Sequence, residues 1–176
     1  YLTILRAALQ EGKVQFEGQR LTARAQLPAP TGVTVMASAL RPNGFSLCGE
    51  LAEGAISWVC PLPYLRDVAV PAIRAGAARA GRSPDDVEVV CVTIVVTGRD
   101  EQQMTRSHEA VRQQLAFYGT TPAYLPVFEL HGYGDLHPEL KALARDGRWS
   151  EMGALIDDEL IRTIAVVGEP HEIAPL

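Results

Sequence analysis

The sequence predicts an α/β fold built on a parallel sheet, and three observations predict it. Three stretches rich in β-branched residues are apolar on both faces, which is typical of parallel strands covered by helices. Each of these stretches is followed by a helical one, so strand and helix alternate along the chain. Finally, 47 % of the 176 residues are apolar and 21 % are charged, which supports a packed core and excludes disorder, collagen and coiled coil.

The elements of the first half are bounded by prolines at helix starts and glycines at helix ends. Before the strands, the apolar stripe of residues 1–9 predicts a helix, and residues 14–18 predict a short extended piece. The alternating part then consists of a strand over 33–39, a helix from Pro42 to Leu51, a strand over 55–59, a helix from Pro61 to Gly81, and a strand over 87–96.

The second half begins as a further helix and then becomes irregular. Gly98-Arg99-Asp100 caps a helix expected from about Glu101 to Phe117, and the prolines and glycines of 120–147 predict short helices in a long excursion. Residues 149–167 are expected to be helical, and a last helix is expected to begin at Gly168-Glu169-Pro170. We expect residues 1–176 to form a single α/β unit.

Charge and cysteine usage exclude several classes of protein. With 16 Lys and Arg against 21 Asp and Glu the net charge is −5, which argues against a nucleic-acid partner. No apolar run reaches the roughly 20 residues of a membrane span, and no signal peptide is recognisable, so we expect a cytoplasmic protein without membrane association. The widely spaced Cys48, Cys60 and Cys91 predict neither a disulfide framework nor a zinc site, and we expect them to be buried as small apolar residues.

The usual catalytic motifs are not found in the sequence. Neither glycine-rich phosphate-binding pattern is present, and Gly44–Gly49 resembles a nucleophile elbow only in part, because it lies inside a predicted helix. The pair His108-Glu109 lacks the second histidine of a zinc protease and is expected on an exposed face, and Asp157–Glu159 is expected to be a solvated helix face. The other histidines share no ligand spacing, so no metal site is predicted: His131, His137 and His171.

The end of the first predicted strand is a candidate binding site because ligands of parallel sheets lie beyond the carboxyl ends of the strands. The small residues there let the backbone approach a ligand closely, and the start of the next helix favours an anion. Arg41 can add a charge-assisted contact, although an ordinary turn with a solvated arginine explains the pattern as well. The residues of this candidate site are Ala37, Ser38, Ala39, Leu40 and Arg41.

The end of the second predicted strand carries Trp58, Val59 and Cys60. A large aromatic side chain at such a rim can form the wall of a pocket for a flat ring system. A tryptophan of the core is the alternative interpretation.

Two segments of the chain carry recognisable motifs: Val35–Pro42, a strand followed by a small-residue turn with proline, and Cys48–Trp58, with its Gly-Glu-Leu-Ala-Glu-Gly motif before the next strand. Together they resemble the middle of luciferase-like monooxygenases, above all their deazaflavin (coenzyme F-420)-dependent branch. Further segments fit the family in the same order: Tyr1–Leu9, Phe16–Gly18, Leu115–Gly119 and Val167–Pro170. The chain departs from the family pattern at Ala39-Leu40, where glycine is frequent, and at Glu53, where aspartate is usual.

The resemblance implies a fold, a cofactor and an activity. The family fold is a (β/α)8 TIM barrel about twice as long as this chain. The chain would therefore be a partial barrel with about three parallel strands and crossover helices, lacking the N-terminal half and the last strand. The small-residue turn would contact the ring or phosphate side of the cofactor, and Trp58, Val59 and Cys60 would line the substrate pocket.

The intact protein would be an oxidoreductase that transfers a hydride between coenzyme F-420 and a small organic substrate, as a homo-oligomer. Its catalytic residues would lie in the N-terminal half, so this chain alone would have little or no activity. Two alternatives stay open: an FMN-dependent luciferase-like monooxygenase, and a noncatalytic α/β module that covers its exposed strand edges by self-association.

Overall fold

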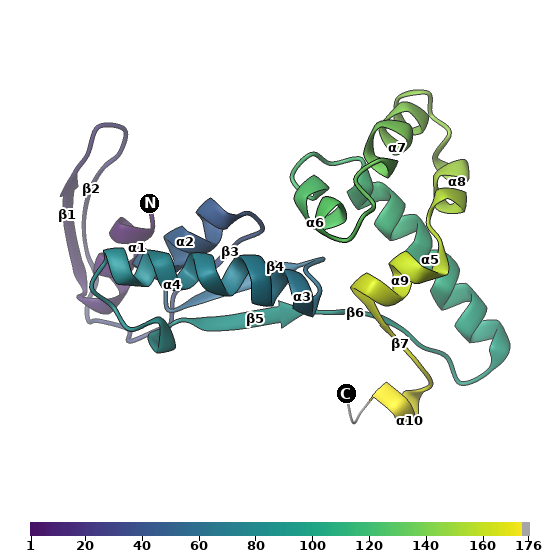
Figure 1. Cartoon of the computed structure of the whole chain (residues 1–176). Coiled ribbons are helices and arrows are strands. Elements are labelled where there is room, and N and C mark those ends of the chain that lie inside the picture. Colours follow the sequence, from purple (N-terminus) through teal and green to yellow (C-terminus); the bar gives the residue numbers. More distant parts are fainter. Residues whose placement is uncertain (174–176) are drawn as a thin grey trace. The chain divides into compact units, whose positions relative to one another are not determined.

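The computed structural model describes residues 1–173, which fall into two compact units (Figure 1). Unit 1 comprises Tyr1–Ile56 and Ala69–Val90, and unit 2 comprises Ser57–Val68 and Cys91–Leu176. The boundaries fall within two strands, β4 (Gly54–Trp58) and β5 (Glu88–Val92), so both strands begin in unit 1 and end in unit 2.

Unit 1 opens with a helix and a hairpin. Helix α1 (Leu2–Gln10) is followed by β1 (Lys13–Glu17), which pairs antiparallel with β2 (Thr22–Gln26). The sequence predicted α1 and β1 but not β2. Four of the five residues of β2 are exposed, so the strand carries no apolar pattern that could mark it and is held by its backbone pairing with β1.

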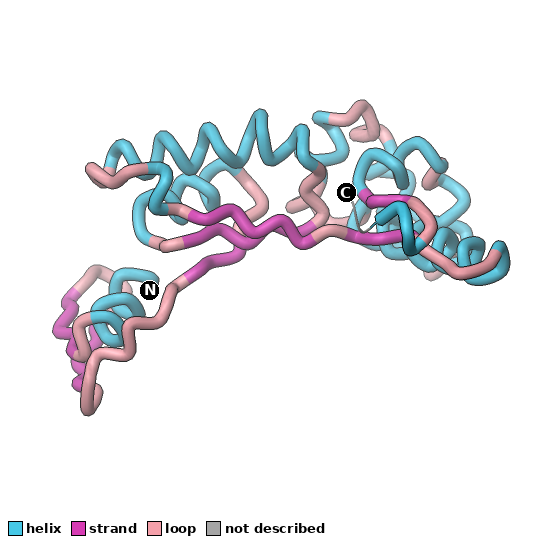
Figure 2. Tube along the Cα trace, turned by 90° about the horizontal axis from the view of Figure 1, so that it is seen from below, coloured by secondary structure: helices cyan, strands magenta, loops and turns pink. Residues whose placement is uncertain are grey.

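The sheet of unit 1 has the order β3-β4-β5, and β3 (Met36–Ser38) runs parallel to β4. Helix α2 (Pro42–Leu51) connects these two strands, and helix α4 (Val70–Arg79), followed by the short 3-10 helix η2 (Pro84–Asp86), precedes β5. Figure 2 shows α4 running along the strands. The parallel pairing and the crossover helices confirm the predicted α/β fold, and the described residues form no closed barrel.

Strand β3 is shorter than the predicted strand over 33–39, and the side chain of Glu53 explains where it begins. The backbone N–H of Val35 donates to Oε2 of Glu53 at 2.9 Å instead of entering a strand ladder. The same carboxylate forms an ion pair with Arg6 of α1 at 2.7 Å. Glu53 therefore joins α1 to the entrance of the sheet.

The electrostatic surroundings of Glu53 favour its charged form. Partial burial raises the pKa of the carboxyl, but it is outweighed by hydrogen bonds from the Val35 N–H and the Gln10 side chain and by the positive charges of Arg6 and Arg82. The net effect is a pKa below the usual value for glutamate. The ionised carboxylate is thus the form that stabilises unit 1.

Helices α2 and α4 approach each other closely because each has a glycine at the crossing. A Cβ atom on Gly76 of α4 would collide with the carbonyl oxygen of Ser46, and a Cβ on Gly49 of α2 would collide with the carbonyl of Ile73. Both glycines are buried, and the core around them contains Phe45 and Ala77. Helix contact at this distance requires residues without side chains.

Unit 2 begins where β4 ends. Helix α3 (Leu62–Tyr64) continues through a π-helical turn (Leu65–Ala69) into α4, so the predicted helix from Pro61 to Gly81 exists but contains a change of hydrogen-bond pattern. The remaining elements are β6 (Ile94–Val96), α5 (Glu101–Gly119), α6 (Leu125–Leu130), α7 (Leu136–Arg145), α8 (Trp149–Met152), the 3-10 turn η3 (Gly153–Leu155), α9 (Asp158–Ile164), β7 (Ala165–Val167) and α10 (Pro170–Ile173).

Two predictions for this half are wrong in detail. The stretch 87–96 forms two strands, interrupted at Thr93, because β5 pairs with β4 whereas β6 pairs with β7. The stretch 149–167 is not one helix: Asp157 caps a new helix by accepting the N–H of Leu160 at 2.7 Å. After α9 the chain becomes a strand, because Ala165–Val167 pairs in parallel with β6.

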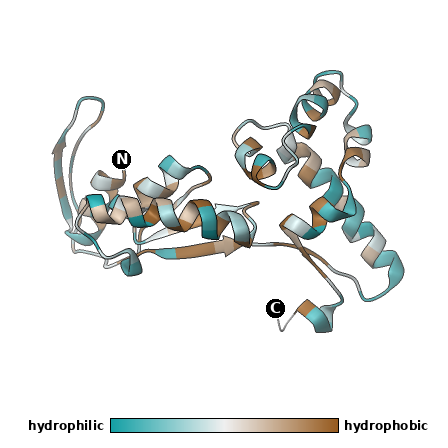
Figure 3. Ribbon diagram, viewed as in Figure 1, coloured by the Kyte–Doolittle hydropathy of each residue, from teal (hydrophilic) through white to brown (hydrophobic). Residues whose placement is uncertain are grey.

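The core of unit 2 lies between its helices and the pair β6-β7. It contains Val96 of β6, Leu115 of α5, Leu140 of α7 and Leu160 of α9, all completely buried. Figure 3 shows that the N-terminal half of α5 is mainly hydrophilic, whereas β5 is mainly hydrophobic. Within residues 1–173, no helix has both the length and the apolar character needed to cross a bilayer.

Candidate functional site

The first candidate site is the turn that follows β3, in unit 1. The N–H of Ala39 donates to the carbonyl of Ile56 at 3.0 Å, which extends the pairing with β4 by one residue. The thiol of Cys48 in α2 lies 3.6 Å from the carbonyl oxygen of Ala37. Ala39 is buried and Ser38 is exposed, so the small side chains of the turn leave its backbone open on one side.

The turn leads directly into helix α2. Arg41 is the N-cap residue, has an extended backbone and is exposed, and Pro42 begins the helix. No side chain caps the first N–H groups of α2. The positive end of the helix and the exposed Arg41 therefore follow directly on a turn of small residues, an arrangement that suits an anionic group. The assignment of Ala37, Ser38, Ala39, Leu40 and Arg41 to a cofactor site stays a prediction.

The second candidate site is the end of β4, in unit 2, where the backbone is unusual. Val59 has φ +57°, and within residues 1–173 it alone combines a positive φ with a side chain. This left-handed conformation is unfavourable for a β-branched residue, and Val59 is almost fully buried in the core that holds it. The turn is tight enough that the thiol of Cys60 donates to the carbonyl of Trp58 at 3.4 Å. Burial raises the pKa of the Cys60 thiol to about 12.

The partly buried Trp58 belongs to a row of aromatic rings. Its ring contacts that of Tyr118, in the last turn of α5, edge to face, with centroids 6.1 Å apart and planes at 76°. Tyr118 in turn contacts Tyr124, with centroids 4.8 Å apart. Sequence reasoning missed both tyrosines, although their position on either side of Pro122 in an otherwise polar turn was visible. Trp58 is thus oriented by neighbours that lie sixty residues further along the chain.

A groove of about 530 Å³ opens at the same end of β4. It is lined by four segments of unit 2: Val59–Pro63, Cys91–Val95, Arg162–Val166 and Ile173. Two of the predicted pocket residues, Val59 and Cys60, are thus brought together with β6 and β7 around one ligand-sized space. Trp58 does not line this groove.

Cys91 differs from its prediction. It was expected to be buried, but its side chain is exposed in the groove, whereas Cys48 and Cys60 are buried as predicted. Cys91 follows the middle of β5, and its Sγ atom lies 3.5 Å from the Thr93 hydroxyl and 3.9 Å from the carbonyl oxygen of Cys60. The apolar run 87–96 suggested that Cys91 is buried, but within the described structure no other segment covers the face of the sheet on which Cys91 lies.

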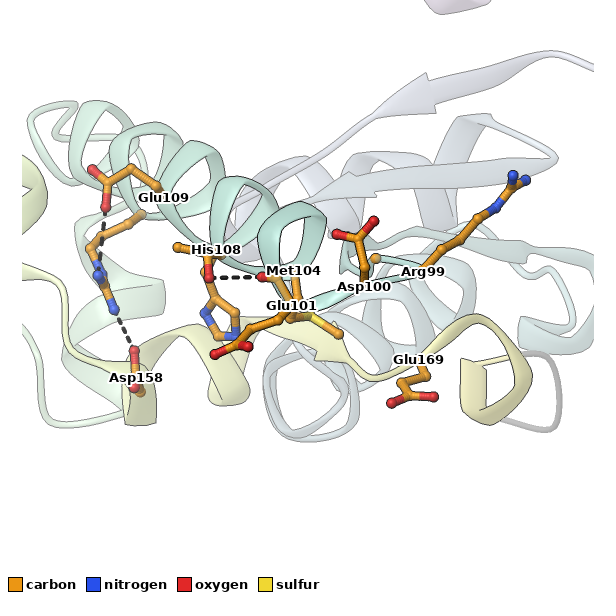
Figure 4. A pocket seen from close by; sticks show the side chains of 11 residues that line it. Arg99, Asp100, Glu101, Met104, His108, Glu109, Asp158 and Glu169 are labelled. Carbon is orange, nitrogen blue, oxygen red and sulfur yellow. Dashed lines mark hydrogen bonds and ion pairs between the residues drawn. The ribbon is translucent and has the colours of Figure 1, made fainter.

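A second pocket of unit 2, of about 450 Å³, lies beside the N-terminal half of α5 and is lined mainly by charged residues (Figure 4). Arg112 forms ion pairs there with Glu109 and with Asp158 of α9. His108 was expected to be exposed but is partly buried, with its ring directed away from α5. Asp157, Asp158 and Glu159 are exposed, as predicted.

Neither pocket offers a metal centre. Among the residues that the structure describes, no three His, Cys, Asp or Glu side chains are placed to share a metal ion. The charged pocket is dominated by carboxylates, two of which pair with Arg112, whereas the groove at β4 is mostly apolar. The groove is therefore the better candidate for an organic ligand.

The parallel strands, the crossover helices and a ligand-sized groove at the end of a strand define an α/β protein with a candidate ligand site. The family model of luciferase-like monooxygenases matches residues 1–175. The chain belongs to this family, in agreement with the resemblance of its motifs.

Two relatives from curated collections illustrate the range of similarity. An uncharacterized protein of Mycobacterium tuberculosis is 41 % identical over 186 residues, which cover 99 % of this chain and 55 % of the relative. A 5,10-methylenetetrahydromethanopterin reductase of Methanopyrus kandleri is 28 % identical over 171 residues, covering 94 % of this chain and 48 % of the reductase. The chain thus spans about half the length of these relatives.

Solved structures show the same fold. The coenzyme F-420-dependent tetrahydromethanopterin reductase of Methanopyrus kandleri superimposes with a TM-score of 0.77 at 24 % identity, over 98 % of this chain and 50 % of the reductase. An F-420-dependent secondary alcohol dehydrogenase in complex with an F-420–acetone adduct gives a TM-score of 0.66 at 17 % identity, over 99 % and 48 % of the two chains.

Proposed function

We propose that the complete protein carrying this sequence is an oxidoreductase that uses the deazaflavin coenzyme F-420. Family membership together with 28 % identity to a reductase over 94 % of the chain supports an oxidoreductase. The choice of F-420 over FMN is supported by the two solved structures of the same fold, which are described as F-420-dependent. Bound coenzyme would supply the hydride chemistry, and the protein would supply binding, orientation and exclusion of water.

The turn after β3 fits a coenzyme that carries an anionic group. Its small residues leave room for close approach of the ligand to the backbone, and the N-terminus of α2 has no side-chain cap. In this proposal Ser38 and Arg41 hold the anionic part, while the buried Ala39 keeps the turn narrow. The thiol of Cys48 donates to the carbonyl of Ala37 at 3.6 Å and would help to keep the turn in place.

The end of β4 would serve the organic substrate. Tyr118 holds the ring of Trp58 edge to face, which restricts the rotation of the tryptophan. The left-handed backbone of Val59 turns the chain away from the sheet, so the groove opens directly beyond the strand. Val59 and Cys60 would exclude water from the reacting atoms.

The proposal is tested by fluorescence titration of the complete protein with F-420 and with FMN. We expect saturable binding of F-420 and much weaker binding of FMN. Tight FMN binding without F-420 binding would favour the FMN-dependent monooxygenase and overturn the proposal. Binding of neither cofactor, together with concentration-dependent assembly in light scattering, would favour the noncatalytic module.

A pair of variants connects the result to the turn. Arg41→Gln removes a charge at the proposed anion site and should weaken F-420 binding about tenfold, the magnitude of one charge-assisted contact. Arg74→Gln removes an exposed charge on α4 and serves as the matched control, for which no change is expected. Circular dichroism checks that both variants remain folded. Equal affinity of both variants would mean that the turn does not hold the coenzyme.

A further inference from the structure

We propose that the groove at the end of β4 binds a substrate with an apolar body and an anionic group, and that Arg162 binds the anion. The inference rests on the proposed oxidoreductase function and deepens it, because it names the substrate class and a specificity-determining residue. It depends on the lining of the groove and on the pairing of the arginines in unit 2.

The lining of the groove is suited to an apolar body. Leu62, Val92 and Val95 all belong to it and are substantially exposed, the two valines by 39 % each. Apolar side chains left open to water in a concave space of about 530 Å³ favour a ligand that covers them. A purely polar substrate would leave the apolar side chains of the groove in contact with water.

Arg162 is the one charged residue among the described residues that line the groove. The side chain projects from the last turn of α9. Two acids lie one turn earlier on this helix: Asp158 pairs with Arg112, and the exposed Glu159 forms no ion pair with Arg162. No ion pair of Arg162 occurs in the described part of the chain, whereas Arg112 of α5 has two acidic partners. Among the described residues, the groove therefore contains a guanidinium without an ion-pair partner beside apolar walls.

This combination selects for charge. A guanidinium offers a planar set of donors that matches a carboxylate or phosphate, and a partner anion is held more strongly next to an apolar wall than in open water. Loss of one charge-assisted contact of this kind weakens binding by about tenfold to a hundredfold. A neutral ligand of the same shape gains nothing from Arg162.

The anion could come from two sources, the substrate or the coenzyme, because a deazaflavin coenzyme also carries a phosphate. The substrate is favoured because the groove begins at Val59 and Cys60, beyond β4, and because its walls match a hydrocarbon body. The experiment separates the two sources by measuring the affinities for both ligands in each variant.

The exposed thiol of Cys91 provides a reporter inside the groove. Its Sγ lies 3.5 Å from the Thr93 hydroxyl, and a ligand that covers β5 and β6 has to cover it as well. The rate at which Cys91 is alkylated, followed by mass spectrometry of its peptide, therefore measures occupancy of the groove. Octanoate, octanamide and inorganic phosphate serve as probes, and the complete protein is used throughout.

The variants are Arg162→Gln, Arg162→Lys and the control Arg106→Gln, which removes an exposed arginine of α5 outside the groove. We expect octanoate to slow alkylation of Cys91 at concentrations at least tenfold lower than octanamide needs. Arg162→Gln should abolish this difference, Arg162→Lys should retain part of it, and Arg106→Gln should retain all of it. Phosphate alone should protect weakly, because it lacks the apolar body.

Four outcomes overturn the inference. Equal protection by octanoate and octanamide in the wild type means that Arg162 is only a solvated cation at a helix C-terminus. An unchanged preference in Arg162→Gln means that another group binds the anion. Protection by phosphate as strong as by octanoate means that the apolar walls contribute nothing. A loss of F-420 affinity in Arg162→Gln with octanoate binding intact assigns the arginine to the coenzyme.

Titration with F-420 keeps this inference distinct from the proposed function. If the wild type binds F-420 but shows no preference for octanoate, the inference fails and the proposed function stands. If octanoate binds through Arg162 but F-420 does not bind, the groove is assigned correctly and the proposed cofactor is wrong.

Discussion

At the crossing of α2 and α4, we predict that replacing a helix glycine with alanine destabilises the protein, although this substitution ordinarily stabilises a helix. Gly76→Ala replaces a glycine in a helix interior, where alanine ordinarily stabilises by about 1 kcal/mol through its higher helix propensity. At this position, however, the new Cβ would collide with the backbone carbonyl of Ser46. A backbone group cannot rotate away as a flexible side chain does, so the two helices have to separate.

The expected magnitude follows from these two contributions. Overpacking of a close contact costs about 1–3 kcal/mol, and contact with backbone belongs at the upper end of that range. Subtraction of the propensity gain leaves a net loss of about 1–2 kcal/mol for Gly76→Ala. The matched control is Ala78→Gly, at an exposed position of the same helix, which should lose about 1 kcal/mol from propensity alone.

Urea unfolding followed by circular dichroism measures both variants against the wild type. The reasoning requires that both substitutions destabilise, although they change helix propensity in opposite directions. Gly76→Ala as stable as the wild type or more so, with Ala78→Gly less stable, would refute the close helix contact.

Three further predictions concern single side chains. Glu53→Gln should lower the free energy of unfolding at pH 7, and the difference from the wild type should shrink as the pH falls from 5 to 3. The pKa of Glu53 is lowered in the folded state, so its pairing with Arg6 stabilises the protein above the unfolded-state pKa and is lost on protonation. A constant difference across an unfolding series from pH 5 to pH 3 would contradict this prediction. Asp157→Ala should destabilise by about 1 kcal/mol through loss of the helix cap, whereas Asp157→Asn should be nearly neutral, and equal unfolding midpoints for the two variants would argue against a cap. At pH 8 an alkylating reagent should modify the exposed Cys91 but not Cys60, because a pKa of about 12 leaves only about one Cys60 thiol in ten thousand as thiolate. If peptide mapping finds that Cys60 is labelled before Cys91, the assigned burial of Cys60 is wrong.

The sequence by itself determined the strand-helix alternation of the middle of the chain and the family to which the chain belongs. Apolar runs, together with Pro42 at a helix start and Gly81 at a helix end, predict alternating strands and helices from local propensity alone, and the structure confirms that alternation. The strand ends followed from the same pattern, because ligand sites of parallel sheets lie where the strands stop. The predicted residues Val59 and Cys60 accordingly line the groove at this end of β4.

Strands that depend on a distant partner could not be read from local sequence. Residues 165–167 continue a helical pattern, and they become a strand because β6 offers a free edge for pairing. The hairpin strand at 22–26 likewise lacks any apolar alternation of its own. In both cases backbone hydrogen bonds to another segment outweigh a weak local preference.

Only the tertiary structure decided which side chains share a site. Tyr118 reaches Trp58 because α5 folds back beside the end of β4, and Arg162 enters the same groove as Cys91 because β7 pairs with β6. Local propensity acts over a few residues, whereas a site is assembled by packing between segments far apart in the chain. For this protein the sequence therefore pointed to residues that line the groove at the end of β4, and the packing of β6, α9 and β7 supplied its other walls and its charge.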